Sequence, residues 1–348
     1  MPDFNNKIRP ILIFFLTVVF SVIFFEIYFR LTEIILPSFV YDDPELGRTH
    51  KAGSLVNLVG AEGFYMGKIN SYGYPAKEYK PQKSDNIFRI ALIGDSYVEG
   101  FQLFERHHFA RLLEKEFNKD STKIIEILNF GTGGADFRGM YLRHIKIAKK
   151  FNPDLTLYFI KKEDLINKDA IPMPEPVLKA DSIVFMPLKA DKFDSKIRQS
   201  FAFVREYSTG NLFKEVFETI YTGRLPEVIF DKFYPDKILS SKNNLDSDSE
   251  LEDKFYSFNE KIIETLSKLN QTGSKIILVE VEELPEKYIN LIKAYNLETI
   301  PLYKELKKHS KYELNYWKAS GKIGHWNHKA HILISKFLLK YLINYRQD

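Results

Sequence analysis

Cysteine is absent from all 348 residues of the sequence. This absence excludes disulfide bonds, catalysis by a thiolate and metal sites with cysteine ligands. An excess of positive charge is also lacking, because 50 Lys and Arg stand against 46 Asp and Glu. A protein that binds nucleic acid needs a concentrated basic face, so we expect no nucleic-acid partner. The hydrophobic fraction of 45% is ordinary for a globular protein and can supply a sizeable core.

A cleavage motif of small residues is missing after the apolar run near the N-terminus. Residues 10–25 are all apolar or Ser/Thr, and residues 27–29 extend the run, which gives about the 20 residues that a bilayer-spanning helix needs. Lys7 and Arg9 precede the run and favour a cytoplasmic N-terminus. Residues 26–36 are bulky, so we expect no signal-peptide cleavage there.

This pattern predicts a cytoplasmic tail over residues 1–9 and an uncleaved signal anchor over residues 10–36. The protein would cross the inner (cytoplasmic) membrane once and hold its C-terminal domain outside the cytoplasm, in the periplasm. Two alternatives remain open, namely a cleaved signal peptide and a helix that is buried in a soluble domain.

The rest of the chain changes character near residue 86. Residues 37–85 contain many Gly, Pro, Tyr and Asn with little periodicity, which predicts an extracytoplasmic spacer. Over residues 86–348, short apolar runs alternate with stretches of helical spacing, and this alternation indicates parallel strands joined by right-handed crossovers. The apolar runs that we expect to be strands are 88–93, 124–128, 155–160 and 275–281.

The tripeptide Gly94-Asp95-Ser96 closes the first of these strands. In an open parallel sheet, reactive groups gather just beyond the carboxyl ends of the strands. A serine that starts a helix there can supply both a nucleophilic hydroxyl and a backbone N–H for an oxyanion. The same tripeptide also makes ordinary turns and helix caps, so both interpretations remain open on this motif alone.

The run Asn129–Gly134 closes the second strand and is rich in glycine. Glycines let the backbone approach a substrate and free N–H groups to point at an anion, although a simple strand-to-helix turn would need them too. A third motif, Gly324–His331, lies before the amphipathic C-terminal stretch. Its three histidines raise the possibility of a metal, but no acidic or cysteine partner follows a ligand pattern, and we expect no metal and no cofactor.

Together these three blocks resemble the SGNH/GDSL hydrolases, in the form of membrane-anchored bacterial members. The resemblance covers about residues 70–160 and 270–345, and its blocks occur in the family's order. It implies an α/β fold, a three-layer α/β/α sandwich with a mostly parallel, flavodoxin-like sheet of about five strands. It also implies Ser96 as the nucleophile, His325 as the general base, and the N–H groups of Ser96 and Gly134 as the oxyanion hole.

The third block of the family departs from its usual form here. The family usually has Gly-x-Asn-Asp after the third strand, and this chain has Glu163 at the Asn position with Asp164 after it. An ionised carboxylate would repel a developing oxyanion. We therefore expect Glu163 to be protonated by burial, to be turned away while Asp164 supports the loop, or to be replaced in its role by Lys161 or Lys162.

The last block departs as well. The family usually has an Asp two or three residues before the catalytic histidine, and here Lys322 and Ile323 occupy those positions. No local carboxylate therefore orients His325, and the loss of such a group can lower a rate by several powers of ten. Asp95 and Asn327 flank the predicted nucleophile and base and complete the set of candidate site residues.

These observations predict a serine-dependent ester hydrolase or O-acyltransferase that works outside the cytoplasm. Its substrate would be a small acyl ester or an acylated carbohydrate of the cell envelope, since those esters are available there. We expect the side chains of Ser96 and His325 to lie within about 4 Å of each other. The alternative is a catalytically impaired protein of the same fold that binds glycan or scaffolds an envelope complex.

Overall fold

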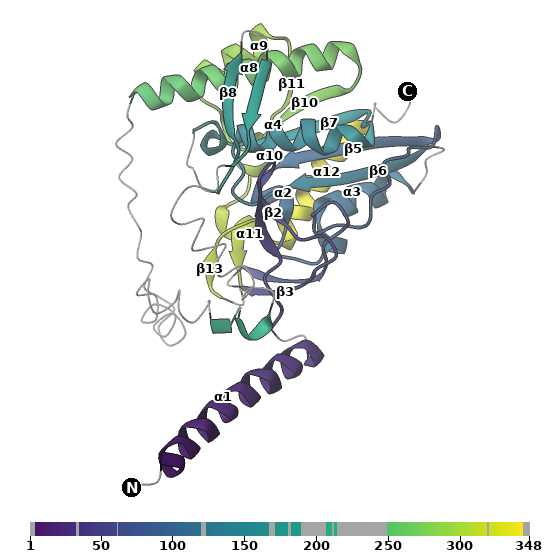
Figure 1. The fold of residues 1–348 in the computed structure, drawn as a ribbon. Coiled ribbons are helices and arrows are strands. Elements are labelled where there is room, and N and C mark those ends of the chain that lie inside the picture. The colour runs from purple at the N-terminus through teal and green to yellow at the C-terminus, as the bar shows by residue number, and fades with distance from the viewer. Residues whose placement is uncertain are drawn as a thin grey trace. The chain divides into compact units, whose positions relative to one another are not determined.

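A computed structural model describes residues 4–32, 35–60, 62–119, 123–166, 171–179, 182–188, 207–210, 212–213, 249–318 and 320–343 (Figure 1). The first three residues of the predicted cytoplasmic tail and the last five residues of the chain lie outside this described part. The chain divides into two units, residues 1–39 with 190–239, and residues 40–189 with 240–348.

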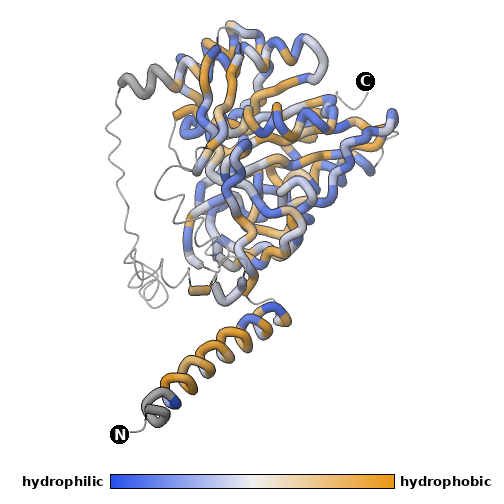
Figure 2. Tube along the Cα trace, in the orientation of Figure 1, coloured by the Kyte–Doolittle hydropathy of each residue, from blue (hydrophilic) through white to orange (hydrophobic). Residues whose placement is uncertain are grey.

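The first unit contains one long helix, α1 (Phe4–Thr32). Within its 24-residue segment Arg9–Thr32, an 18-residue window has a mean hydropathy of 2.5, and no residue of that window is buried. Figure 2 shows the helix as apolar along most of its length. At about 1.5 Å per residue it is long enough to cross the roughly 30 Å hydrocarbon layer of a membrane. This statement rests on length and composition, and the signal-peptide alternative passes the same test.

The second unit is built on a parallel sheet of five strands in the order β11-β10-β7-β5-β6. Every neighbouring pair in this sheet is parallel, so the predicted α/β class is confirmed. The chain order reverses at β5, because β6 pairs on one side of it and β7 on the other, and such reversal points form crevices at the carboxyl ends of strands. The strands are β5 (Ile87–Gly94), β6 (Ile124–Gly131), β7 (Leu155–Ile160), β10 (Lys275–Glu280) and β11 (Glu298–Ile300).

Both faces of the sheet are covered, which explains why its strands are near-continuous apolar runs. Along β5, Ile90 and Leu92 pack into one core cluster, and Ala91 and Ile93 pack into the cluster on the opposite face. Helices therefore form the two outer layers, as the predicted three-layer sandwich requires (Figure 1). The first cluster includes residues of α3 (Phe109–Phe117) and α12 (His328–Leu342), and the second those of α4 (Phe137–Lys146), α8 (Ser249–Thr272) and α9 (Glu286–Ala294).

Much of residues 37–85, which we expected to be a spacer, is folded as part of this unit. Tyr74 and Tyr79 are buried in the core, and the Tyr79 hydroxyl bonds the backbone of Asn129 at 3.0 and 2.8 Å. Short strands explain the poor periodicity of this segment. They pair as the hairpins β1 (Val40–Asp43) with β2 (Gly47–His50), and β3 (Leu55–Gly60) with β4 (Gly63–Lys68).

The remaining elements are short. Two further antiparallel pairs are β8 (Glu175–Lys179) with β9 (Ser182–Met186), and β12 (Tyr316–Trp317) with β13 (Lys322–Ile323). Short helices are α2 (Ser96–Glu99), α10 (Leu302–Leu306) and α11 (Lys311–Asn315), and the 3₁₀ turns are η1 (Glu105–His107), η2 (Ala148–Phe151) and η3 (Lys162–Leu165). Those that matter for function, α2, η3, α10 and α11, lie beyond the carboxyl ends of the parallel strands.

Candidate active site

The predicted nucleophile, Ser96, is the first residue of α2 and follows β5 through a tight turn. Asp95 caps this helix, because its side chain accepts a hydrogen bond of 3.0 Å from the Tyr97 amide. Gly94 has no room for a side chain, since a Cβ there would lie 2.3 Å from a methyl group of Val98. The capping role of the motif therefore belongs to Asp95, and the hydroxyl of Ser96 is left available for another partner.

That partner is His325. The Oγ atom of Ser96 and the Nε2 atom of His325 are 2.7 Å apart, well within the separation that we expected. The imidazole also packs on the Tyr97 ring with a centroid distance of 4.6 Å. The backbone carbonyl of His325 accepts a hydrogen bond of 3.0 Å from the indole of Trp317. Two residues that are 229 positions apart in the sequence are thus held in hydrogen-bonding contact.

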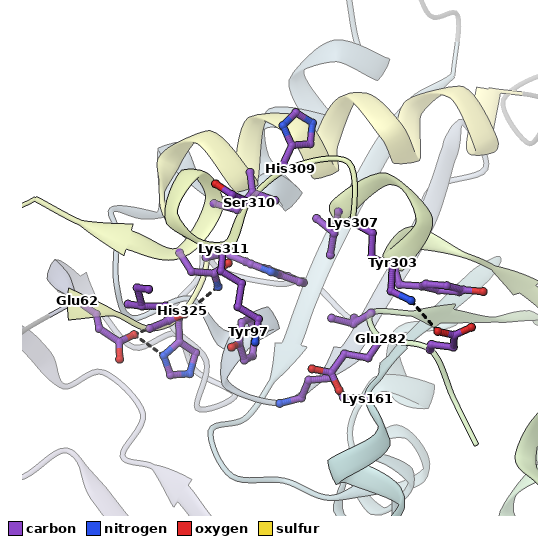
Figure 3. A pocket seen from close by; sticks show the side chains of 18 residues that line it. Glu62, Tyr97, Lys161, Glu282, Tyr303, Lys307, His309, Ser310, Lys311 and His325 are labelled. Atoms are coloured by element: carbon purple, nitrogen blue, oxygen red, sulfur yellow. Dashed lines mark hydrogen bonds and ion pairs between the residues drawn. The ribbon is translucent and has the colours of Figure 1, made fainter. Parts of the chain in front are cut away.

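A carboxylate lies on the other side of the imidazole, and it belongs to Glu62. One oxygen of Glu62 accepts hydrogen bonds from His325 Nδ1 at 2.5 Å and from the His325 backbone N–H at 2.7 Å (Figure 3). The hydrogen bond from His325 holds the pKa of Glu62 below its ordinary value, against the opposing effect of partial burial. A carboxylate only accepts, so Nδ1 carries a proton and Nε2 presents its lone pair to Ser96.

Our sequence reasoning missed Glu62, because it sought a carboxylate only beside the histidine. Glu62 lies in the turn between β3 and β4, 263 positions before His325. The sequence nevertheless has glycines at positions 324 and 63, beside His325 and Glu62, where a side chain would not fit. A Cβ at Gly324, directly before the histidine, would lie 2.2 Å from the Glu62 carboxyl carbon. Gly63 has a φ of +103°, and a Cβ there would lie 2.4 Å from the Gln102 carbonyl oxygen.

The glycine-rich loop after β6 lies against the helix that carries Ser96. A Cβ at Gly131 would lie 2.3 Å from the backbone nitrogen of Glu99, and the Thr132 amide donates to the Gly94 carbonyl at 3.0 Å. Gly134, the second predicted oxyanion donor, is exposed and has a φ of +77°. The loop is therefore fixed to the nucleophile turn at two points and leaves the backbone of Gly134 open to solvent.

The third block forms the turn η3, and its two acids are placed differently. Glu163 is exposed. Asp164 is buried, and its carboxyl accepts a hydrogen bond of 2.8 Å from the Lys161 amide, which fixes the turn. Burial raises the pKa of Asp164 well above its usual range. Asp164 thus supports the loop, as one of the expected cases requires.

Lys161 reaches into the site from the end of β7. Its ammonium group lies 2.7 Å from the second oxygen of Asp95 and 4.6 Å from the centroid of the Tyr97 ring. Burial opposes its charge, but the negative charge of Asp95 and the hydrogen bond to that carboxylate outweigh this effect and raise the pKa of Lys161. A buried ion pair thus ties the end of β7 to the turn that carries Ser96.

The remaining candidate, Asn327, has a structural place. Its side-chain oxygen caps α12 by accepting from the amides of Lys329 and Ala330 at 2.9 and 3.2 Å. Its amide group donates to the carbonyls of Glu313 and Tyr316 at 2.9 and 3.1 Å. These four contacts leave no part of Asn327 for a substrate, and they anchor the loop two residues after His325.

The neighbouring histidines take part in packing. His331 is buried, and its Nδ1 accepts a hydrogen bond of 3.1 Å from the Phe109 amide, while His328 packs against Trp317 at 6.0 Å between ring centroids. Within the described residues no group of three or more His, Asp or Glu side chains is arranged to hold a metal ion. The histidine run therefore supplies one imidazole to the site and two to the surrounding structure.

A cavity of about 750 Å³ opens beside the histidine (Figure 3). Glu62, Tyr97, Lys161 and His325 lie along one side of it. Its outer rim comes from the loop after β10 and from the segment of α10 and α11, with the charged or hydrogen-bonding residues Glu282, Glu283, Tyr303, Lys307, Ser310 and Lys311. Apolar side chains, among them Val281, Leu306 and Leu314, also line the cavity, so it offers both apolar surface and hydrogen-bonding groups.

No family model matches the chain, and no curated protein matches it. Several solved structures are similar to this chain, and they include two esterases or acylhydrolases and a G-D-S-L family protein. The acetyl xylan esterase AlAXEase is 14% identical with a TM-score of 0.39, and the match covers 73% of this chain and 100% of that one. A lipase/acylhydrolase from Enterococcus faecalis is 12% identical with a TM-score of 0.35, and the match covers 74% and 96%.

The third is a protein assigned to the lipolytic G-D-S-L family from Desulfitobacterium hafniense, which is 12% identical with a TM-score of 0.35, over 72% of this chain and 98% of that one. Its description carries the family name that the sequence motifs resemble. At such identities the likeness concerns the arrangement of sheet and helices. The roles proposed below therefore rest on the geometry of this chain.

Proposed function

We propose that this protein is a serine-dependent esterase whose catalytic triad is Ser96, His325 and Glu62. The observation that carries the proposal is the continuous hydrogen-bonded line from the serine hydroxyl through the imidazole to the carboxylate, at 2.7 and 2.5 Å. A nucleophile, a base and a group that orients the base, in mutual contact, are the parts that acyl transfer requires.

The order of the reaction steps follows from the protonation of His325, whose Nδ1 carries a proton and whose Nε2 can accept one. The Ser96 oxygen attacks the ester carbonyl while Nε2 of His325 takes its proton, and the Glu62 carboxylate stabilises the imidazolium that forms. The oxyanion is held by backbone N–H groups of Ser96 and Gly134. Collapse of the tetrahedral intermediate breaks the ester bond, and the leaving oxygen takes the proton back from Nε2. Water, or a hydroxyl group in an acyltransferase, then attacks the acyl-enzyme by the same route.

One departure from the family pattern, the missing local carboxylate, has a structural counterpart, which supports the proposal. Glu62 stands where the missing local carboxylate would act, on Nδ1 of the histidine. Glu163 is exposed. The alternative of a protein that only binds glycan is disfavoured by the carboxylate that Glu62 supplies to His325.

For the substrate, we propose an ester whose alcohol part is rich in hydroxyl groups, such as an acylated carbohydrate of the cell envelope. The cavity beside His325 supports this, because charged side chains and two tyrosines lie among the residues that line it. We further propose that α1 anchors the protein in the inner membrane with this site on the periplasmic side. Lys7 and Arg9 before the apolar segment favour that orientation.

The test is covalent labelling of the full-length protein in detergent by a fluorophosphonate, followed by hydrolysis of a small activated ester. We expect labelling at Ser96 and turnover, with both lost in Ser96→Ala. An unlabelled serine together with no turnover of acetyl esters or of acetylated oligosaccharides would refute the esterase. A reporter fused to the C-terminus tests the orientation, because a reporter that is active only in the cytoplasm should be inactive there.

A further inference from the structure

A second glutamate near the nucleophile, Glu99, has no part in the triad described above. It is the last residue of α2, and its side chain is 8% exposed. The carboxyl group reaches the loop after β6 and accepts a hydrogen bond from the Gly133 amide. A Cβ at Gly133 would lie 2.7 Å from its Oε2 atom, so the loop rests directly on this carboxyl group.

The other oxygen of Glu99 faces His50 on β2. Oε1 lies 3.4 Å from Nε2 of His50, and Nδ1 of the same ring lies 3.0 Å from the Gly73 carbonyl oxygen. A carbonyl only accepts, so Nδ1 carries the proton of the neutral ring and Nε2 is an acceptor. Two acceptors would repel at this contact, and the arrangement is favourable when Glu99 carries a proton.

The electrostatics of the two groups agree with that placement of the proton. Burial raises the pKa of Glu99 to about 8, although the Gly133 amide and Arg143 oppose the shift. Burial lowers the pKa of His50 to about 4. Near neutral pH the imidazole is therefore neutral, and the carboxyl group is mostly protonated.

We propose that Glu99 is a positioning residue, which supports the 131–134 loop and in its neutral form places no charge beside the oxyanion, and that its ionisation impairs catalysis. The inference rests on the esterase proposed above. Ionisation would break the contact with His50 and place a negative charge directly beneath the loop. A charge there opposes the oxyanion that the loop should stabilise.

The titratable and charged groups that face Glu99 or its partner are Asp95 at the start of α2, Arg48 and His50 on β2, Tyr74 after the hairpins, and Arg143 on α4. Burial raises the pKa of Tyr74 to about 12 and lowers the pKa of His50 to about 4. Of Glu99, His50 and Tyr74, Glu99 is the one whose pKa lies at mildly alkaline pH. Asp95 forms an ion pair with Lys161.

The experiment compares the full-length wild type with Glu99→Gln, whose amide is neutral at every pH and can donate to His50 while accepting from Gly133. We expect kcat/KM of the wild type on an activated ester to fall by about tenfold or more as the pH rises through about 8. Glu99→Gln should keep most of the neutral-pH rate and lose this alkaline decline. Glu286→Gln, at an exposed site on α9, is the matched control and should behave as wild type.

A second readout does not need turnover. With ¹³C-labelled Glu and ¹⁵N-labelled Gly, one carboxyl signal should titrate near 8, the Gly133 amide should shift with the same midpoint, and both changes should vanish in Glu99→Gln. An alkaline decline that persists in Glu99→Gln would overturn the positioning role, as would a Glu99 signal in the ordinary range of a glutamate. If the fluorophosphonate does not label Ser96 while these titrations are observed, the esterase proposal is refuted. The proposed response of the loop to the ionisation of Glu99 would then still be supported.

Discussion

Two glutamate–histidine pairs flank the helix that carries Ser96, and they hold opposite charge states. Glu62 is 32% exposed and accepts two hydrogen bonds from His325, whereas Glu99 is 8% exposed and meets His50 at 3.4 Å. The pKa of the first is lowered by those bonds, and the pKa of the second is raised to about 8 by burial. Donors and solvent access, and not the residue type, decide which glutamate is a charged partner.

The two pairs also differ in the nitrogen that the glutamate meets. In both rings Nδ1 faces an oxygen acceptor, which is the Glu62 carboxylate for His325 and the Gly73 carbonyl for His50. The free Nε2 of His325 can therefore take a proton from Ser96. In the second pair, Nε2 of His50 faces Oε1 of Glu99. Because Nε2 of the neutral ring carries no proton, the proton at this contact must be on the Glu99 carboxyl group. The same two residue types thus form a proton acceptor in one place and a support for a loop in the other.

Replacing Glu62 should have the largest effect, because it removes the charged partner from the first pair. In Glu62→Gln we expect kcat to fall by about 10³–10⁴, since a neutral amide neither fixes the Nδ1 proton nor stabilises the imidazolium. Steady-state hydrolysis of an activated ester measures this loss. Lys68→Gln on the same hairpin should be active as wild type, and near-normal activity of Glu62→Gln would exclude Glu62 from the triad.

Breaking the ion pair beside the nucleophile should lower stability more than rate. Lys161→Met leaves Asp95 buried without its counter-charge, which should reduce the free energy of unfolding by about 3 kcal/mol. Chemical denaturation with a tertiary probe measures the change. The double variant Lys161→Met with Asp95→Asn should recover much of the loss, and equal stability of single variant and wild type would refute the pair's contribution.

The fit of Glu62 against His325 can be disturbed without touching either residue. Gly324→Ala should push the Glu62 carboxyl group away, because the new Cβ would lie 2.2 Å from its carbon. We expect kcat to fall by about 10–100-fold with only a small change in KM, since misplaced catalytic groups lose rate at this scale. Gly273→Ala is the control, because nothing lies within 4 Å of its Cβ position. A fully active Gly324→Ala would contradict the close approach.

The smallest effect is expected at Asn327, which supports the first pair from a distance. Asn327→Ala removes the cap of α12, and lost caps usually destabilise a protein by about 1 kcal/mol. Differential scanning calorimetry should show a drop in Tm of a few degrees with kcat changed less than in any variant above. A loss of activity as large as that of Glu62→Gln would show that Asn327 acts in the chemistry.

The sequence predicted the parts of the site that are encoded locally. Ser96 lies at the end of an apolar strand, and the motif before α12 places His325, so strand and helix patterns carried both to the same sheet edge. Our sequence reasoning missed Glu62, because a hairpin turn has no periodic pattern of apolar residues. The contact of Glu62 with His325 also depends on how the hairpin packs in the tertiary structure. Residues 37–85 looked like a spacer for the same reason, since four-residue to six-residue strands are too short for alternation to stand out.

Glu163 shows a different limit. Alignment of the motif placed it where a neutral donor is usual, but the turn η3 leaves it exposed and turns Asp164 inward. The orientation of a side chain within one 3₁₀ turn depends on backbone geometry that the residue types did not specify. The position in the motif was therefore a poor guide to the role of the residue.

The hairpin that bears Glu62 also sets the shortest chain in which the reaction can be expected. Trimming the protein to residue 86, where the pattern of strands and helices begins, would keep Ser96 and His325 and discard the carboxylate. Such a fragment would show a serine and histidine in place and little turnover, a result easily mistaken for a naturally inactive protein. Cutting instead between α1 and β1, before residue 40, would remove the apolar helix and keep all three side chains.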